Sequence, residues 1–273
     1  MALADHSSMG LLILKLILTP LLIATATLAV RRWGFLLGGL FTGLPLVSGS
    51  VSLFLALERG PLFAEQGIHG MLVGTVALVA FCVAYVRTAK GPGWLVPAIA
   101  GFISYCLAAW GLSFFSFDLG ILTLLVLVFL SAAVKAAGSP VSSAPKVAAP
   151  SWDIPIRMVT AAAMVLCITG FAERLGPKWS GILAPFPIFT SIMGIFAQKQ
   201  NGAVAAHRLI RGIIIGGFGA VAFYLVVGLA VERTSIAVTY LFAAAAALAT
   251  NGLCLVALTR GRSSRLDRAH FGQ

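Results

Sequence analysis

Charge is scarce in this sequence. Asp, Glu, Lys and Arg make up 10% of the 273 residues, whereas 60% of the residues are hydrophobic, and the mean hydropathy is +1.02. A water-soluble domain of this size needs more charged residues to cover its surface. The composition therefore excludes a soluble globular protein and predicts an all-α polytopic membrane protein, with membrane lipid as a partner. The formal net charge is +11, but the basic residues stand singly at the ends of apolar runs, so we expect no nucleic-acid partner.

Acidic residues are absent from the middle of the apolar runs. Glu58, Glu173 and Glu232 all stand at the ends of such runs. Carriers that are coupled to protons or cations commonly hold an acid within the membrane. The sequence therefore gives no support to coupling through a buried carboxylate.

Motifs for catalysis and metal binding are also missing. The sequence has no P-loop, HExxH or GxSxG motif. The four cysteines (Cys82, Cys106, Cys167 and Cys254) fall inside apolar runs without metal-ligand spacing, which predicts buried free thiols. We therefore expect no catalytic residue, no metal site and no cofactor, and a protein that is not an enzyme.

The apolar runs predict nine membrane-crossing segments. Arg31 and Arg32 follow the first run instead of preceding it, which favours a retained helix over a cleaved signal peptide. The predicted spans are 9–30, 34–58, 67–87, 94–114, 118–136, 154–173, 179–199, 209–231 and 235–258.

Basic residues divide unequally between the two faces of this arrangement. With the N-terminus outside, fourteen of the 19 Lys and Arg residues lie on one face, and Lys15, Arg59, Arg174, Lys178 and Arg233 lie on the other. The positive-inside rule assigns the richer face to the cytoplasm. We therefore expect an integral protein of the bacterial cytoplasmic (inner) membrane, with its C-terminus in the cytoplasm. Lys15 and Arg157 each lie about one turn inside their helix ends, and we expect both to extend to the membrane interface.

Two predicted spans are interrupted by proline. Gly43-Leu44-Pro45 divides the run from Trp33 to Gly60, and Pro185-Phe186-Pro187 divides the run from Trp179 to Gly202. Proline removes a helical donor and pushes the preceding residue out of the α region. We interpret each run as two half-helices, although ordinary proline kinks are the simpler alternative.

The chain also matches itself at an offset of 142 residues. Residues 12–85 align with 154–227 without a gap. The matches at Gly, Pro and charged or hydroxyl positions include Lys15/Arg157, Arg32/Arg174, Gly34/Gly176, Gly39/Gly181, Pro45/Pro187, Ser48/Thr190, Gly60/Gly202, Gly70/Gly212 and Gly74/Gly216. With five spans separating equivalent positions, the second unit enters the membrane upside down, as in the inverted repeats of many secondary transporters.

This interpretation divides the chain into four parts. Residues 1–115 form the first repeat (spans 1–4), and 116–153 hold the fifth span and a cytoplasmic linker. Residues 154–258 form the inverted repeat (spans 6–9), and 259–273 form a basic cytoplasmic tail. The paired Gly-xxx-Gly motifs at Gly70 and Gly212 predict close helix packing, within the fold or in a homodimer.

The candidate substrate-binding residues follow from the two interruptions. If broken helices 2 and 7 cross at the midplane, their half-helix N-termini and the nearby hydroxyls face one place. The candidates are Thr42, Gly43, Pro45, Ser48, Gly49, Ser50, Pro185, Pro187, Thr190 and Ser191. We expect a small secondary transporter or facilitator that moves an anionic or zwitterionic organic solute. The alternative is a non-transporting protein, either a partner subunit or an enzyme acting on a lipid-borne substrate.

Overall fold

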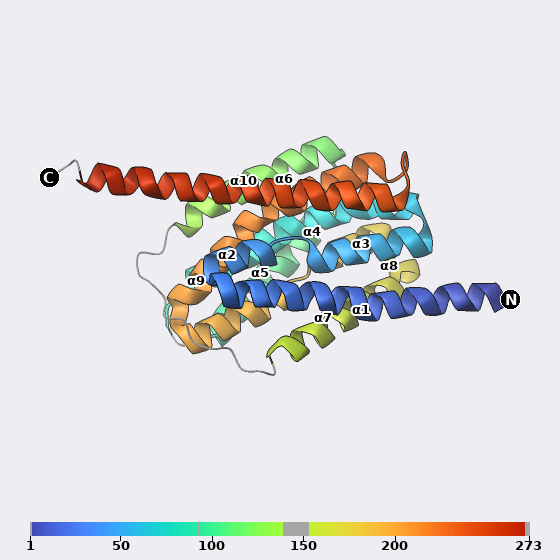
Figure 1. The fold of residues 1–273 in the computed structure, drawn as a ribbon, viewed down its shortest axis with the longest axis horizontal. Helices are drawn as coiled ribbons and strands as arrows, with labels where there is room; N and C mark the ends of the chain where they lie inside the picture. Colours follow the sequence, from blue (N-terminus) through green and yellow to red (C-terminus); the bar gives the residue numbers. More distant parts are fainter. Residues whose placement is uncertain (1, 92, 139–152, 271–273) are drawn as a thin grey trace.

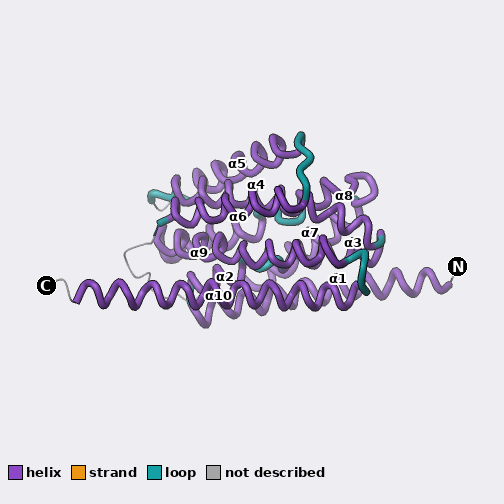
Figure 2. The backbone as a smooth tube through the Cα atoms, turned by 90° about the horizontal axis from the view of Figure 1, so that it is seen from above, coloured by secondary structure: helices purple, strands orange, loops and turns teal. Residues whose placement is uncertain are grey.

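The computed structural model describes residues 2–91, 93–138 and 153–270. Within these residues every regular element is an α-helix, in agreement with the all-α prediction. The helices form one bundle along the long axis of the molecule, and the two chain ends lie at opposite ends of it (Figure 1). Seen from above, α5 lies on one side of the bundle, and α1 and α10 lie on the other (Figure 2).

Apart from the stretch between α6 and α7, most of which lies outside the described residues, the helices follow one another with short connections. Their bounds are α1 Ala2–Trp33, α2 Phe35–Thr42, α3 Leu46–Arg59, α4 Pro61–Thr88, α5 Leu95–Ser113, α6 Leu119–Ala137, α7 Asp153–Gly170, α8 Ala172–Leu183, α9 Ile188–Ala230 and α10 Ile236–His270. The predicted third span begins earlier than expected, since α4 starts at Pro61. Proline suits the first position of a helix because the N–H it lacks would be unpaired there.

Several of these stretches have the length and composition of membrane spans. Among the described residues, six qualify: Phe35–Arg59, Pro61–Thr88, Leu95–Ser113, Leu119–Ala137, Ala172–Ala230 and Ile236–Leu258. Two shorter apolar helices cover Leu12–Thr25 and Ile154–Gly170. The chain is therefore an α-helical membrane protein.

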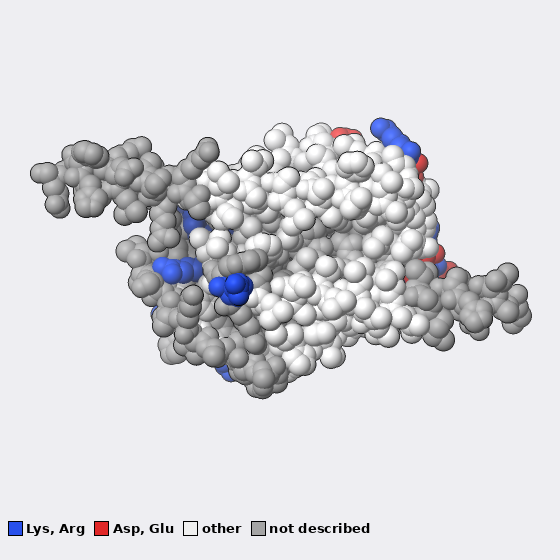
Figure 3. Space-filling model, viewed as in Figure 1, with Lys and Arg blue, Asp and Glu red and all other residues white. Residues whose placement is uncertain are grey.

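The outer surface suits a lipid environment. Val96, Leu107 and Trp110 on α5, and Leu241 and Leu253 on α10, are each more than 60% exposed. Figure 3 shows Lys and Arg side chains near the end of the bundle where the C-terminus lies, and charges of both signs near the opposite end. Between these ends, the described side chains on this face are uncharged. An apolar band between two charged ends is the surface expected of a protein that spans a bilayer.

Four glycines reverse the chain direction in the same way. Gly34 and Gly60 separate α1 from α2 and α3 from α4, with φ of 86° and 93°. Gly176 and Gly202 lie inside α8 and α9 with φ of 69° and 80°, so each of these helices is two helices joined at a kink. Only glycine adopts this backbone conformation without strain.

Glycines also allow two pairs of helices to pack backbone against backbone. Gly39 and Gly43 of α2 face Gly212 and Gly216 of α9. A Cβ at Gly39 would lie 2.9 Å from the Gly212 Cα, and one at Gly43 would lie 2.7 Å from the Gly216 Cα.

The second pair joins α8 and α4. Gly181 of α8 faces Gly70 of α4, and a Cβ at Gly74 would lie 2.6 Å from the Pro185 Cγ. The Gly70-xxx-Gly74 and Gly212-xxx-Gly216 motifs therefore pack within the fold, one of the two alternatives that the sequence leaves open.

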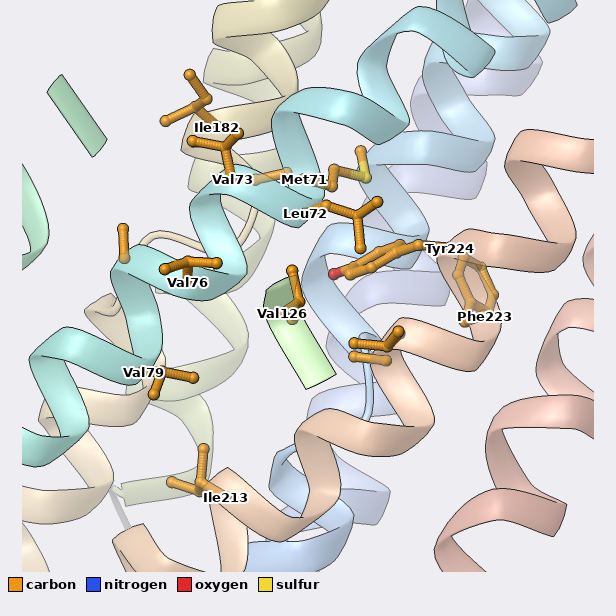
Figure 4. Close-up of a cluster of buried hydrophobic side chains, with 14 of the residues drawn as sticks. Met71, Leu72, Val73, Val76, Val79, Val126, Ile182, Ile213, Phe223 and Tyr224 are labelled. Carbon is orange, nitrogen blue, oxygen red and sulfur yellow. The ribbon is translucent and has the colours of Figure 1, made fainter. Parts of the chain in front are cut away.

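The core lies between α4, α6 and α9. Figure 4 shows Val76 and Val79 of α4, Val126 of α6, and Ile213 and Tyr224 of α9 around the same interior space. All of these side chains are buried. Helix α6 contacts both α4 and α9, so it fills the space between the two parts of the chain that flank it.

The structure corrects the prediction for Lys15. Its side chain is 6% exposed and does not reach the surface. The Lys15 Nζ lies 2.5 Å from the Glu58 Oε1 on α3, donates to the Thr169 Oγ1 on α7 at 2.8 Å, and lies over the Phe54 ring. The partners come from other helices, which the position of Lys15 in its own helix does not reveal. The Arg157 side chain lies outside the described part of the chain.

The cysteine prediction is correct for Cys82 alone. Cys82 is buried, whereas Cys106 and Cys167 are exposed and Cys254 is intermediate, and all four are free thiols. An apolar run does not tell which side of a helix faces lipid, so burial cannot be predicted from the run. The linker residues 139–152 lie outside the described residues, and α10 continues into the predicted tail as far as His270.

Candidate functional site

The segments 43–45 and 184–187, which we call the first and second turns, have the same hydrogen-bonding pattern. In the first turn, Leu46 N–H donates to Leu44 O at 2.7 Å, and Gly49 N–H donates to Pro45 O at 2.7 Å. In the second turn, Ile188 N–H donates to Phe186 O at 2.8 Å, and Ser191 N–H donates to Pro187 O at 2.8 Å.

Proline is the N-cap of the helix that follows each turn. Pro45 precedes α3, Pro187 precedes α9, and neither helix is capped by a side-chain hydrogen bond. The first N–H groups of a helix have no partner within the helix, and they carry partial positive charge. Each turn therefore places at a cavity a helix N-terminus that lacks a side-chain cap and whose first N–H is bonded within the turn.

The cavity has a volume of about 70 Å³, is open on one side, and lies between the two turns. Its walls come from both turns, from α3, α4 and α9, and from single residues of α2, α6 and α7. The lining residues are Thr42, Gly43, Leu44, Pro45, Leu46, Val47, Ser48, Thr75, Leu78, Val79, Cys82, Leu130, Met164, Ala184, Pro185, Phe186, Phe189, Thr190, Ile213, Ile214, Gly217, Ala220 and Tyr224.

The structure brings six of the ten candidate residues together at this cavity. They are Thr42, Gly43, Pro45, Ser48, Pro185 and Thr190. The other four do not line it: Gly49, Ser50, Pro187 and Ser191. The sequence thus located both turns, but it did not resolve which side of each following helix faces the cavity.

The candidate hydroxyls fall into two groups. Thr42, Ser50 and Ser191 donate to carbonyl oxygens of their own helices: Gly38 O at 2.7 Å, Leu46 O at 2.7 Å and Ile188 O at 2.8 Å, respectively. This is the ordinary behaviour of a hydroxyl in a membrane helix.

Ser48 and Thr190 behave differently. The Ser48 Oγ lies 2.6 Å from the Tyr224 Oη, a hydrogen bond in which either group can be the donor. Thr190 is 6% exposed and lines the cavity, and its hydroxyl has no hydrogen-bond partner among the described residues. The hydroxyls of Ser48 and Thr190 therefore lie at the cavity without a bond to a carbonyl of their own helix, unlike the other three.

Tyr224 is the site residue that sequence reasoning missed. It lies in α9, is 1% exposed, and places its hydroxyl at the cavity beside Ser48. At the offset of 142 it aligns with Cys82, so the internal match gives no indication of it. A tyrosine in the middle of a long apolar run was the available signal, because a buried tyrosine hydroxyl needs a polar partner.

A second serine–tyrosine pair lies one helical turn further along α3. The Ser52 Oγ and the Tyr240 Oη of α10 are 2.6 Å apart, and neither residue lines the cavity. The two pairs have the same chemistry and the same distance. Only the Ser48–Tyr224 pair can reach a ligand in the cavity.

No charged side chain is among the cavity-lining residues. Two ion pairs of the described residues lie elsewhere: Lys15 with Glu58, and Arg59 with Glu173 at 3.2 Å. Within the described ranges, no group of three or more His, Cys, Asp or Glu residues could hold a metal ion. The polar character of the cavity therefore comes from hydroxyls and helix termini.

Comparison with known protein families, curated proteins and solved structures finds no match for this chain.

Proposed function

We propose that this protein is a small secondary transporter or facilitator that moves an anionic or zwitterionic organic solute by alternating access. The solute would bind at the midplane between the first and second turns. The cavity at which both turns meet carries this proposal, because uncapped helix N-termini and buried hydroxyls line it from two distant parts of the chain. Irregular backbone at membrane depth is tolerated where it lines a cavity.

An inverted repeat of two four-span units is part of this proposal. The turn hydrogen bonds, the proline N-caps and the positive-φ glycines all recur at the offset of 142. The packing also recurs with exchanged partners, because α2 of the first unit packs on α9, whereas α8 of the second packs on α4. A pseudo-two-fold relation between the units accounts for this exchange.

The proposed arrangement has nine membrane spans. The stretch Ala172–Ala230 has 59 residues and would be ~88 Å long as one helix, against a hydrocarbon core of ~30 Å. Dividing it at Gly202, and counting Leu12–Thr25 and Ile154–Gly170, gives nine. Phe35–Arg59 and the part of this stretch before Gly202 are then the two discontinuous spans.

Alternating access would require the two units to move relative to each other around the cavity. The units would meet at the glycine contacts and along α6, which contacts α4 and α9. A pseudo-symmetric pair of units can exchange conformations, which opens a central site first to one side and then to the other.

The experiment is solute uptake by the purified full chain in proteoliposomes. A panel of labelled organic anions and zwitterions identifies a transported solute. The Ser48→Ala/Thr190→Ala double variant should then weaken its apparent affinity, at about 0.5–1.5 kcal/mol for each lost hydrogen bond, while expression stays unchanged.

The matched control is Ser50→Ala/Ser191→Ala. These hydroxyls also follow the two turns, but they bond to their own helices and do not line the cavity. The control should transport like the wild type. Equal effects of both double variants, or wild-type uptake by Ser48→Ala/Thr190→Ala, would contradict the proposed site.

A further inference from the structure

The walls of the cavity favour one kind of solute. Most lining side chains are apolar, with Phe186, Phe189 and Met164 among the largest. No Lys, Arg or His is present to neutralise a second negative charge, and no Asp or Glu to hold an ammonium group. Burying a charge without a partner is costly. The cavity therefore disfavours dianions and cations.

The hydroxyl pair can still offer a hydrogen bond to a ligand. Ser48 and Tyr224 together have two hydroxyl protons, and the bond between them uses one. The second proton can go to an acceptor in the cavity or to the hydroxyl oxygen of Thr75, with which Tyr224 also interacts. Thr75 lines the same cavity, but its own proton is donated to Met71 O at 2.7 Å.

Further donors come from the opposite turn. The Thr190 hydroxyl is buried at the cavity without a partner among the described residues, and both helix N-termini are uncapped. Hydroxyl donors and helix N-termini both favour an acceptor that carries negative charge. A carboxylate has two such oxygens, and it carries one charge only.

We propose that the solute is a monocarboxylate with an apolar body, and that Tyr224 is a specificity-determining residue that recognises its carboxylate together with Ser48. The apolar body lies against the side chains of Phe186, Phe189 and Met164. This inference rests on the proposed function, which it narrows from anionic or zwitterionic solutes to one class.

Binding to the purified full chain tests the inference directly. The probes are hexanoate and benzoate, with succinate, phenylalanine and hexylamine as dianionic, zwitterionic and cationic comparisons. Isothermal titration calorimetry or thermal stabilisation should show binding of hexanoate or benzoate and much weaker binding of the other three. The Tyr224→Phe variant should weaken the binding of the monocarboxylate roughly tenfold or more, because it loses a hydrogen bond to a charged group.

Tyr240→Phe is the matched control. It breaks the bond to Ser52, which has the same length as the Ser48–Tyr224 bond and also involves a serine of α3, but which lies away from the cavity. It should leave the affinity unchanged even if it lowers thermal stability. A merely structural role for Tyr224 predicts equal effects of the two variants, and that outcome would overturn the inference.

The remaining outcomes separate this inference from the transporter proposal. Strongest binding by succinate, phenylalanine or hexylamine, or no binding by any probe, would overturn the monocarboxylate assignment. Uptake of another solute that depends on Ser48 and Thr190 would then leave the transporter proposal standing. Binding of benzoate or hexanoate without any flux would contradict transport, while the assignment of the ligand would remain.

Discussion

At the scale of single residues, the ion pair between the buried Lys15 and Glu58, whose side chain is 25% exposed, ties three helices together. Lys15 comes from α1, Glu58 from α3, and the acceptor Thr169 from α7. A charge inside the membrane needs such partners, because an isolated one has no water to solvate it. The pair therefore holds the N-terminal helix against the part of the chain that carries the first turn.

Replacing Lys15 tests this role. Lys15→Met should lower the stability of the purified protein by roughly 1–3 kcal/mol, between the values for an exposed and a fully buried pair, since it leaves the partly exposed carboxylate of Glu58 without its cation. The measurement is the midpoint of thermal unfolding in detergent, or retention of the folded fraction after heating.

Arg59→Met is the comparison on the neighbouring residue of α3. Its partner Glu173 has a side chain that is 79% exposed, and an exposed pair contributes only about 0–1 kcal/mol. Arg59→Met should therefore change the unfolding midpoint little. Loss of stability that is as large for Arg59→Met as for Lys15→Met would show that burial does not determine the effect.

At the scale of elements, the glycine contacts determine how closely the helices approach. Gly74 faces Ile182 and Pro185, and Gly216 faces Gly43, in each case with no space for a side chain. Van der Waals contact between backbones is a main source of helix association in membranes. These contacts therefore position both turns next to the cavity.

Gly74→Leu and Gly216→Leu should each destabilise the protein by at least about 2 kcal/mol, because the added side chain must separate two packed backbones. Thermal unfolding of the purified variants measures the effect. Gly111→Leu in α5 and Gly252→Leu in α10 are controls, since a Cβ at either glycine meets no atom within 4 Å. Wild-type stability of both Gly74→Leu and Gly216→Leu would contradict the packing described for α4 and α9.

Local chemistry explains which elements were predictable. Both turns could be located from Pro45 and Pro187, because proline acts on its own neighbours in the chain. The amide of Asn251 in α10 donates to Leu40 O of α2 at 3.3 Å. By contrast, the bond of Ser48 to Tyr224 and that of Lys15 to Glu58 depend on which helices pack together. No local pattern contains that information.

At the scale of the whole molecule, the two chain ends lie at opposite ends of the bundle (Figure 1). The uneven division of basic residues assigns one of these ends to the cytoplasm. Reporter tags should therefore place the N-terminus outside and the C-terminus in the cytoplasm. A paired reporter set, with one active only outside and the other only in the cytoplasm, measures this. Both termini in one compartment would contradict the proposed nine spans and, with them, the proposed inverted repeat.

The exchange of packing partners between distant helices has a consequence for biosynthesis. Helix α2 packs on α9, and α4 packs on α8. The glycine faces of α2 and α4 therefore pack against helices that are made much later in the chain. Because a chain is made from its N-terminus, α2 and α4 must wait in the bilayer until the ribosome has produced residues 172–230. Until then Gly39, Gly43, Gly70 and Gly74 face lipid or a passing helix. The cavity can therefore form only late in synthesis, when α8 and α9 insert and pack against α4 and α2, which entered the membrane earlier.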